Sequence, residues 1–158
     1  MRLIVVRHGT AKSKRAWKGR DQDRPLTASG LKQAKAVSSR VARLRPERVI
    51  SSPSVRCIET VAPLVSARGL RVEQNRLLGT DGGQAAVEWL RRLVEEPPSS
   101  STIAVCTHRE VIVKVLPAFA SQFGISLGHR LPGAKGSCWI LQFREGRLVE
   151  IKYWRPSN

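Results

Sequence analysis

The chain has 158 residues, of which 41% are hydrophobic and 25% charged, and 28 Lys and Arg against 12 Asp and Glu give a formal net charge of +16. This composition excludes a disordered chain, and the lack of a long apolar run excludes a signal-peptide core and a membrane span. We therefore expect a single domain over residues 1–158 that is cytoplasmic, makes no membrane contact and attracts anionic partners.

The first predicted element is a buried β-strand over Leu3–Val6. The run is short, continuous and mostly β-branched, which is typical of a strand covered on both faces of a parallel sheet. Arg7, His8 and Gly9 follow it directly. Because ligands bind beyond the carboxyl ends of strands in an open α/β sheet, an arginine and a histidine at this point are suited to holding or attacking an anionic group.

Four helices follow a basic segment, Lys12–Arg24, which has no hydrophobic period and is expected to form a loop. The first helix is expected to begin after an N-cap at Thr27 and to run through to Pro46, with an inward face of Leu31, Ala34, Val37, Val41 and Leu44. The other helices are expected from Pro53 to Gly69, from Gln84 to Glu95 and from about Glu110 to Gln122. Pro117 is expected to kink or shorten the last of them.

Strands alternate with these helices. They are predicted over Arg48–Ser51, Leu70–Glu73 and Thr102–Cys106, and a closing β-hairpin is predicted over Ser137–Phe143 and Arg147–Tyr153 around Glu145-Gly146. The alternation favours an α/β fold, a three-layer αβα sandwich with a mostly parallel central sheet.

A second histidine, His108, also follows a buried strand directly, and Arg56 lies one turn into the helix after the second strand. If these strand ends share one edge of the sheet, both residues converge with Arg7 and His8 on one pocket. Arginine presents a planar charged fork that matches phosphate oxygens, and an unprotonated imidazole can attack phosphorus. We expect the neighbouring cations to lower the pKa of His8. A single histidine after a strand is more often a packing residue, so the inference depends on the four together.

The three cysteines, Cys57, Cys106 and Cys138, are scattered and odd in number. They predict small buried residues in a reducing compartment rather than disulfides or a zinc site. No cluster of oxygen ligands and no grouping of the three histidines indicates a metal site either.

An ordered set of motifs runs through the chain. Its pieces are Arg7-His8-Gly9, Pro25-Leu26-Thr27 with Gly30 and Ala34, Ser51-Ser52-Pro53 with Arg56 and Thr60, and Thr107-His108. In this order and spacing the chain resembles the histidine phosphatase superfamily, the phosphoglycerate-mutase-like phosphatases. An isolated Arg-His-Gly is a weak signal, whereas the ordered set is a strong one.

The resemblance implies a phosphoglycerate-mutase-like fold and an enzyme that hydrolyses a phosphomonoester or a terminal phosphate in two steps. It implies that His8 is the nucleophile that becomes phosphohistidine, and that no metal or organic cofactor takes part. The other site residues that it implies are Arg7, Arg56 and His108 in the phosphate pocket, with Thr10 and Thr107 as substrate-binding residues.

The chain departs from the family at the proton donor. Many relatives carry a glutamate shortly after the third strand, but residues 77–83 contain none. Asp81 is the alternative acid, provided that burial raises its pKa, and a turn aspartate between glycines is an equally good interpretation. Without a strong acid, substrates with good leaving groups, such as phosphoramidates and phosphoanhydrides, are favoured.

Two subgroups resemble the chain in detail. In its small size and its lack of an obvious acid, the chain resembles the SixA-type phosphohistidine phosphatases. Arg7–Ala11 with Lys18-Gly19, and Lys135–Ser137 before Trp139, resemble the phosphatase half of Nudix–histidine phosphatase fusions, which act on nucleoside di- and polyphosphates. The chain carries no Nudix signature, so we expect either a stand-alone relative or one domain whose partner is a Nudix domain or protein.

The basic loop adds weaker candidates. Of its six Lys and Arg, we expect most to be solvated and choose Lys18 as the substrate-binding one. Trp17 is expected either to stack on a base or to fix the loop. Lys135 and Ser137 depend only on the resemblance to the fusions.

Three functions follow, from two classes. The favoured one is a histidine phosphatase acting on an anionic phosphorylated small molecule, with a nucleotide first. The second is a phosphatase of phosphohistidine on a signalling protein. The third is a basic nucleic-acid-binding module without catalysis, against which no helix has a clustered basic face and no RNA-binding strand motif is present.

Overall fold

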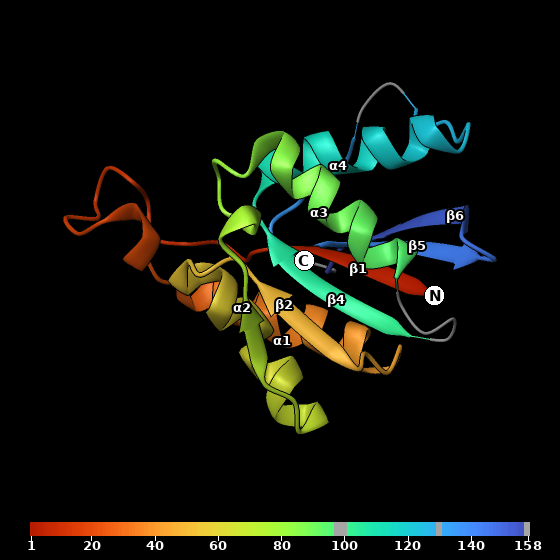
Figure 1. Ribbon diagram of the computed structural model, residues 1–158. Coiled ribbons are helices and arrows are strands. Elements are labelled where there is room, and N and C mark those ends of the chain that lie inside the picture. Colours follow the sequence, from red (N-terminus) through yellow and green to blue (C-terminus); the bar gives the residue numbers. More distant parts are fainter. Residues whose placement is uncertain (97–100, 129–130, 157–158) are drawn as a thin grey trace.

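The structure, a computed structural model, describes residues 1–96, 101–128 and 131–156. Six strands form one mixed sheet in the order β3-β2-β4-β1-β5-β6 (Figure 1). The two central strands, β1 (Arg2–Arg7) and β4 (Thr102–Thr107), are parallel neighbours. The outer strands are β2 (Arg48–Ser51) and β3 (Val72–Gln74), both parallel to the centre, and the antiparallel pair β5 (Cys138–Arg144) and β6 (Arg147–Trp154).

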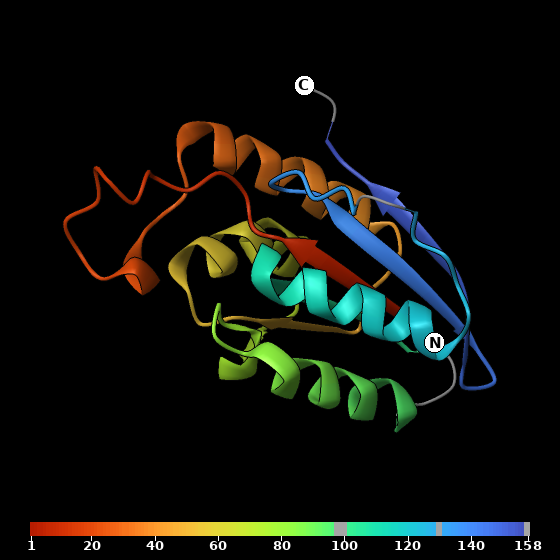
Figure 2. The ribbon, with the colours of Figure 1, turned by 90° about the horizontal axis from the view of Figure 1, so that it is seen from above.

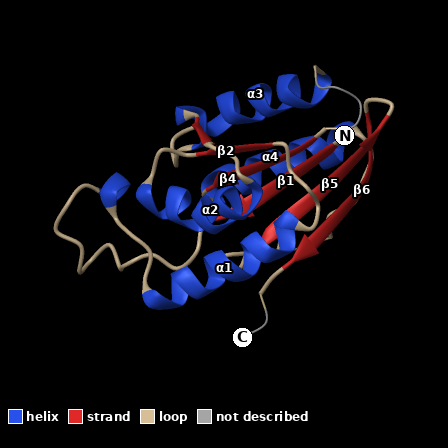
Figure 3. Cartoon of the chain, turned by 90° about the horizontal axis from the view of Figure 1, so that it is seen from below, coloured by secondary structure: helices blue, strands red, loops and turns tan. Residues whose placement is uncertain are grey.

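Helices cover both faces of the sheet, as Figures 1 and 3 show. One face carries α1 (Ala28–Ala42) and α2 (Val55–Arg68), and the other carries α3 (Gly83–Glu95) and α4 (Arg109–Gln122). Alternation along β1 divides the core in two, because Ile4 packs toward α1 and α2 while Leu3 packs toward α3 and α4. The three-layer α/β fold with a mostly parallel sheet is confirmed.

The strand order reverses between the parallel neighbours β1 and β4. After β1 the chain crosses to α1 on one face, and after β4 it crosses to α4 on the other. Neighbouring strands whose connections leave to opposite faces open a crevice at their carboxyl ends, where ligands bind in open α/β sheets. Both Arg7-His8 and Thr107-His108 lie at this crevice.

The first helix differs from its predicted pattern at one position. Thr27 is the N-cap, since its hydroxyl accepts from the Gly30 amide at 3.1 Å. Leu31, expected to face inward, is 48% exposed. Gly30 takes the inward place because the chain packs so closely there that a Cβ atom would lie 2.1 Å from the Thr10 carbonyl oxygen.

Several element ends also differ from the prediction. The first helix ends at Ala42, well before Pro46, and α2 begins two residues after Pro53. The edge strand β3 is only three residues long, and α4 continues through Pro117. The hairpin turn is confirmed, with positive φ at Glu145 (48°) and Gly146 (72°).

The three cysteines are buried and form no disulfide, as predicted. Among the helices that the structure describes, none combines the length and the apolar character that a membrane span requires.

Candidate active site

The two histidines that follow the central strands lie side by side. Their ring centroids are 5.2 Å apart with the planes inclined at 63°. His8 is 9% exposed and His108 is 1% exposed. The parallel register that pairs Arg7 with Thr107 brings the residues after them together, as the sequence predicted from two separate strand ends.

The hydrogen bond of His8 decides which of its nitrogens is free. Nδ1 lies 2.7 Å from the carbonyl oxygen of Gly9. A carbonyl oxygen can only accept, so Nδ1 carries the proton and Nε2 of the neutral ring carries the lone pair. The Gly9 amide in turn donates to Thr60 Oγ1 at 3.0 Å, which fixes the loop to α2.

The hydrogen bonds of His108 give the opposite assignment. Its Nδ1 lies 3.3 Å from Arg56 Nη2, and because a guanidinium can only donate, Nδ1 accepts. Nε2 therefore carries the proton and donates to Ser52 Oγ at 3.0 Å. Ser54, the N-cap residue of α2, makes no capping bond, and its hydroxyl lies 3.4 Å from the same nitrogen.

Two arginines complete the group. Arg7 donates through Nη1 to the Gly133 carbonyl oxygen, and Arg56, 2% exposed, donates through Nη1 to the backbone oxygen of Asp21 at 2.7 Å. The Nε atoms of both arginines are buried without a hydrogen-bond partner. Both side chains line one cavity, where their guanidinium groups are suited to binding an anion.

The surroundings keep His8 unprotonated. The pKa of His8 is lowered to about 3, mainly by burial; the hydrogen bond from Nδ1 to Gly9 opposes this shift, and the charges of the neighbouring His108, Arg56 and Arg7 add to it. The expected direction of the shift is therefore found, but burial contributes more than the neighbouring cations. At neutral pH the ring is uncharged and its Nε2 lone pair is available.

A cavity of about 590 Å³ opens beside these side chains. Six Lys and Arg line it against a single acidic residue, Glu110. Its basic residues are Arg7, Lys12, Lys14, Arg24, Arg56 and Lys135, and its other lining residues are His8, Thr10, Ala11, Ser13, Thr27, Thr80 and His108. The positive lining with a buried imidazole fits a phosphorylated ligand.

Known proteins share this arrangement of elements. The family model described as "Histidine phosphatase superfamily (branch 1)" matches residues 3–79, which hold Arg7, His8 and Arg56. The 8-oxo-(d)GTP phosphatase of Mycolicibacterium smegmatis is 29% identical over 160 residues, which cover 99% of this chain and 48% of that protein. The N-terminal half of the chain is therefore similar to the histidine phosphatase superfamily.

Solved structures agree at the level of the fold. The mycobacterial glucosyl-3-phosphoglycerate phosphatase complexed with VO3 matches with a TM-score of 0.76 at 18% identity over 99% of both chains. The protein histidine phosphatase SixA complexed with tungstate matches with a TM-score of 0.75 at 20% identity over 99% of this chain and 97% of that one. The family model and the phosphatase relative support a hydrolase of phosphate esters, although this chain spans only about half the length of that relative.

The structure brings some of the remaining candidate residues into the cavity. Thr10 lines it, and its amide donates to Gln33 Oε1 at 2.8 Å. Lys135 lines it as well. Thr107 is fully buried and its hydroxyl donates to the Leu78 carbonyl oxygen at 2.7 Å, so this side chain fixes the end of β4.

Lys18 and Trp17 lie apart from the cavity. Lys18 is exposed and absent from the lining, where Lys12 and Lys14 of the same loop are present. Trp17 donates through Nε1 to the Arg20 carbonyl oxygen at 2.9 Å, which fixes the loop onto itself rather than onto the body of the protein. Figure 2 shows this loop extending away from the layers of the fold.

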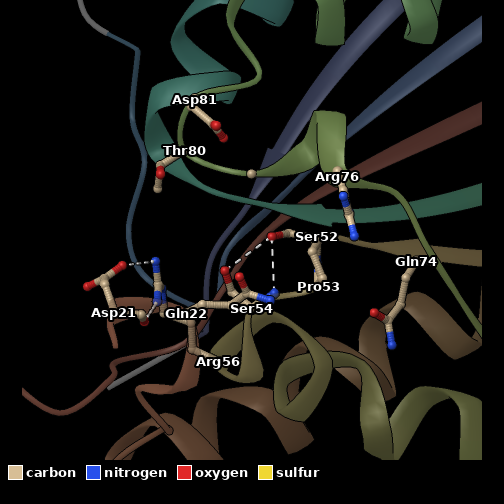
Figure 4. A pocket seen from close by; sticks show the side chains of 11 residues that line it. Asp21, Gln22, Ser52, Pro53, Ser54, Arg56, Gln74, Arg76, Thr80 and Asp81 are labelled. Carbon is tan, nitrogen blue, oxygen red and sulfur yellow. Dashed lines mark hydrogen bonds and ion pairs between the residues drawn. The ribbon is translucent and has the colours of Figure 1, made fainter. Parts of the chain in front are cut away.

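Asp81 lines a second cavity, of about 740 Å³, which shares Arg56 and Thr80 with the first. Figure 4 shows Thr80 and Asp81 on one side of this opening and Asp21 with Arg56 on another. Asp81 is exposed, so the burial that would make it an effective acid is absent. Its placement fits the interpretation as a turn residue.

Sequence reasoning missed Asp21 and the two serines that contact His108. Asp21 accepts from Arg56 Nη2 through Oδ2 at 2.9 Å. The available signal was an aspartate within a segment that is otherwise strongly basic. Ser52 was named only as part of a motif and Ser54 was not named. Their role depends on a contact between the segment before α2 and the residue after β4, which no local pattern encodes.

Proposed function

We propose that this protein is a histidine phosphatase that hydrolyses the terminal phosphate of a nucleoside di- or polyphosphate through a phosphohistidine on His8. The observation that carries the proposal is the free Nε2 lone pair of a buried, neutral His8 beside two arginines with unpartnered donors. An electron pair and an anion-binding fork in one cavity are the two requirements of a nucleophilic phosphoryl transfer.

In the first step, His8 Nε2 attacks the terminal phosphorus. The N–P bond forms as the bond from phosphorus to the bridging oxygen breaks, and the leaving group departs with that electron pair. Arg7 and Arg56 stabilise the charge on the phosphoryl oxygens, and His108 holds Arg56 through its Nδ1. The hydrogen bond from Nδ1 to the Gly9 carbonyl oxygen stabilises the positive charge that the ring acquires.

In the second step, water attacks the same phosphorus and the N–P bond breaks. The electron pair returns to Nε2, and inorganic phosphate leaves with the oxygen of the water. The resting state of the ring is restored because the proton stays on Nδ1, which donates to the Gly9 carbonyl oxygen throughout. The cycle consumes one water molecule for each phosphate released.

The nucleotide assignment is supported by charge and by chemistry. Lys12, Lys14 and Lys135 line the cavity beyond the catalytic group and suit the further phosphate of a di- or polyphosphate. The phosphate leaving group of a phosphoanhydride departs readily without a strong acid, which agrees with the exposed position of Asp81. The relative from M. smegmatis, whose name states a nucleotide substrate, supports the same class.

Rapid-quench trapping of the phosphoenzyme tests the proposal. The full chain is mixed with terminally labelled GDP, with p-nitrophenyl phosphate and with a histidine-phosphorylated signalling protein. We expect an acid-labile label on the enzyme and steady phosphate release from GDP. Turnover of the phosphorylated protein alone would replace the nucleotide by the signalling substrate.

The nucleic-acid alternative has its own measurement. DNA affinity that falls with salt, in a protein without turnover and unaffected by His8→Ala, would identify a binding module instead of an enzyme. We expect His8→Ala to abolish turnover and any DNA affinity to be weak at physiological salt.

A further inference from the structure

A residue of the basic loop holds the catalytic arginine from outside the pocket. Asp21, in the short turn Asp21–Asp23, accepts from Arg56 twice, at 2.7 Å through its backbone oxygen and at 2.9 Å through Oδ2 (Figure 4). The Arg56 side chain is 2% exposed, whereas that of Asp21 is 45% exposed. An exposed carboxylate thus fixes a buried guanidinium.

The same carboxylate is held from a second direction. Its Oδ1 accepts from Arg24 Nε at 3.0 Å, and Arg24, 8% exposed, donates in turn to the Lys12 carbonyl oxygen at 2.6 Å. Burial by itself would raise the pKa of Asp21, but the charges and hydrogen bonds of Arg56 and Arg24 lower it. The carboxylate is therefore ionised at neutral pH and bridges two arginines that would otherwise repel each other.

These contacts determine which part of Arg56 remains for a substrate. Asp21 occupies the Nη1 and Nη2 end of the fork, and Nη2 also donates to His108 Nδ1 at 3.3 Å. Nε, by contrast, is buried and unpartnered. Because charge-assisted hydrogen bonds are directional, rotating the guanidinium would break two of them at once.

We propose that Asp21 is a positioning residue that fixes the guanidinium of Arg56 so that its free donor edge meets the transferring phosphoryl group. This role rests on the proposed phosphatase function. The contacts of Asp21 and Arg24 also connect the loop that carries Lys12 to the phosphate pocket. Asp21 itself touches no reacting atom. It acts through Arg56, whose misplacement by a fraction of an ångström weakens the clamp.

In the opposite role, the Asp21 carboxylate competes with substrate for Arg56, and substrate must displace it. The two roles differ in sign. If Asp21 positions Arg56, removing its charge weakens the binding of a phosphate analogue and slows turnover. If Asp21 competes, removing its charge tightens that binding.

The test compares Asp21→Asn with Asp23→Asn. Asp23 lies in the same turn, and its carboxylate pairs with exposed Arg20 rather than with Arg56, so it is a matched control. We expect Asp21→Asn to weaken orthovanadate binding, measured by calorimetry, about tenfold and to lower kcat by roughly 10- to 100-fold with a smaller change in KM. Asp23→Asn is expected to change each quantity less than twofold.

A double-mutant cycle separates positioning from a general structural role. In an Arg56→Ala background, Asp21→Asn is expected to cause no further loss of vanadate affinity, because its effect passes through the missing side chain. An equal loss in both backgrounds, or tighter vanadate binding in Asp21→Asn, overturns the proposal. Asp21→Ser, also at an exposed site, provides the same comparison if the first variant unfolds.

Vanadate binding keeps this test independent of the substrate. If the wild-type chain binds vanadate but turns over no phosphate compound, the proposed function fails while the role of Asp21 on Arg56 is still measured. If GDP is hydrolysed and the two aspartate variants behave alike, the proposed function stands and the positioning role fails.

Discussion

The ends of β1 and β4 look equivalent in sequence, yet they have become chemically different. Each buried central strand is followed directly by a histidine, and the two rings are 5.2 Å apart. His8 binds a backbone carbonyl through Nδ1 and leaves Nε2 free, whereas His108 accepts from Arg56 at Nδ1 and donates to Ser52 from Nε2. His8 keeps a free lone pair on Nε2, whereas both ring nitrogens of His108 form hydrogen bonds.

This difference shows that the hydrogen-bond partner of Nδ1 decides which nitrogen of each ring carries the proton. A carbonyl oxygen forces a proton onto Nδ1, and a guanidinium forces a lone pair there. Burial, which is nearly the same for both, does not separate them. We therefore expect His8 to carry the phosphoryl group and His108 to stabilise charge through Arg56, which it holds.

The largest effect is expected from His8→Ala. Turnover should fall by about 10⁴-fold or more, since the covalent intermediate has no atom to form on. Quenched reactions with labelled GDP should show no labelled protein, while circular dichroism should show an unchanged fold. A labelled band in this variant would transfer the nucleophilic role to another residue.

His108→Ala should have a smaller effect of a different kind. Loss of one stabilising group in the pocket typically lowers kcat by roughly 10²- to 10³-fold. The label should still form, more slowly, on His8, and stopped-flow mixing with p-nitrophenyl phosphate gives its rate. If the label disappears entirely, the division of roles between the rings is wrong.

Acid stability reports the unprotonated state of His8 directly. Its pKa is about 3 in the fold against 6.5 as the ordinary value. Between these two pH values only the unfolded chain binds the proton, so the free energy of unfolding falls with falling pH, by up to about 1.4 kcal/mol per pH unit. Urea unfolding from pH 7 to pH 4 should show a shallower decline for His8→Ala than for wild type. Equal slopes would mean that burial does not hold His8 neutral.

The smallest expected effect separates two lysines. Lys135 lines the cavity and Lys18 does not. Lys135→Ala should raise KM for GDP by roughly two- to fivefold, the size of a solvent-exposed charge interaction, and Lys18→Ala should leave it unchanged. A larger effect from Lys18 would place the basic loop over the bound substrate.

Much of the fold follows from local patterns. Buried runs of β-branched residues predicted both central strands, and the Thr27 cap and the positive-φ hairpin turn are chemical signals that act over a few residues. Leu31 was placed wrongly because its exposure depends on how closely α1 approaches the loop at Thr10. That distance is a property of tertiary packing, which periodicity does not contain.

For the site, sequence motifs named the residues but not their contacts. His8, His108, Arg7 and Arg56 lie together because parallel strands share an edge, a rule that needs no coordinates. Lys18 and Asp81 were chosen for their charge and their neighbours in sequence, and both are exposed outside the catalytic cavity. Asp21 could not be chosen, because only the path of the loop brings it to Arg56.

The close approach of α1 to the first strand end limits how this centre can vary. A Cβ atom on Gly9 would lie 2.8 Å from the Gly30 carbonyl oxygen, and one on Gly30 would lie 2.1 Å from that of Thr10. A single methyl group at residue 30 would therefore push the helix away from the nucleophile's loop. We expect such a change to abolish activity although every reactive side chain is still present. Inactive relatives should therefore be sought among proteins that lack these glycines as well as among proteins that lack the reactive residues.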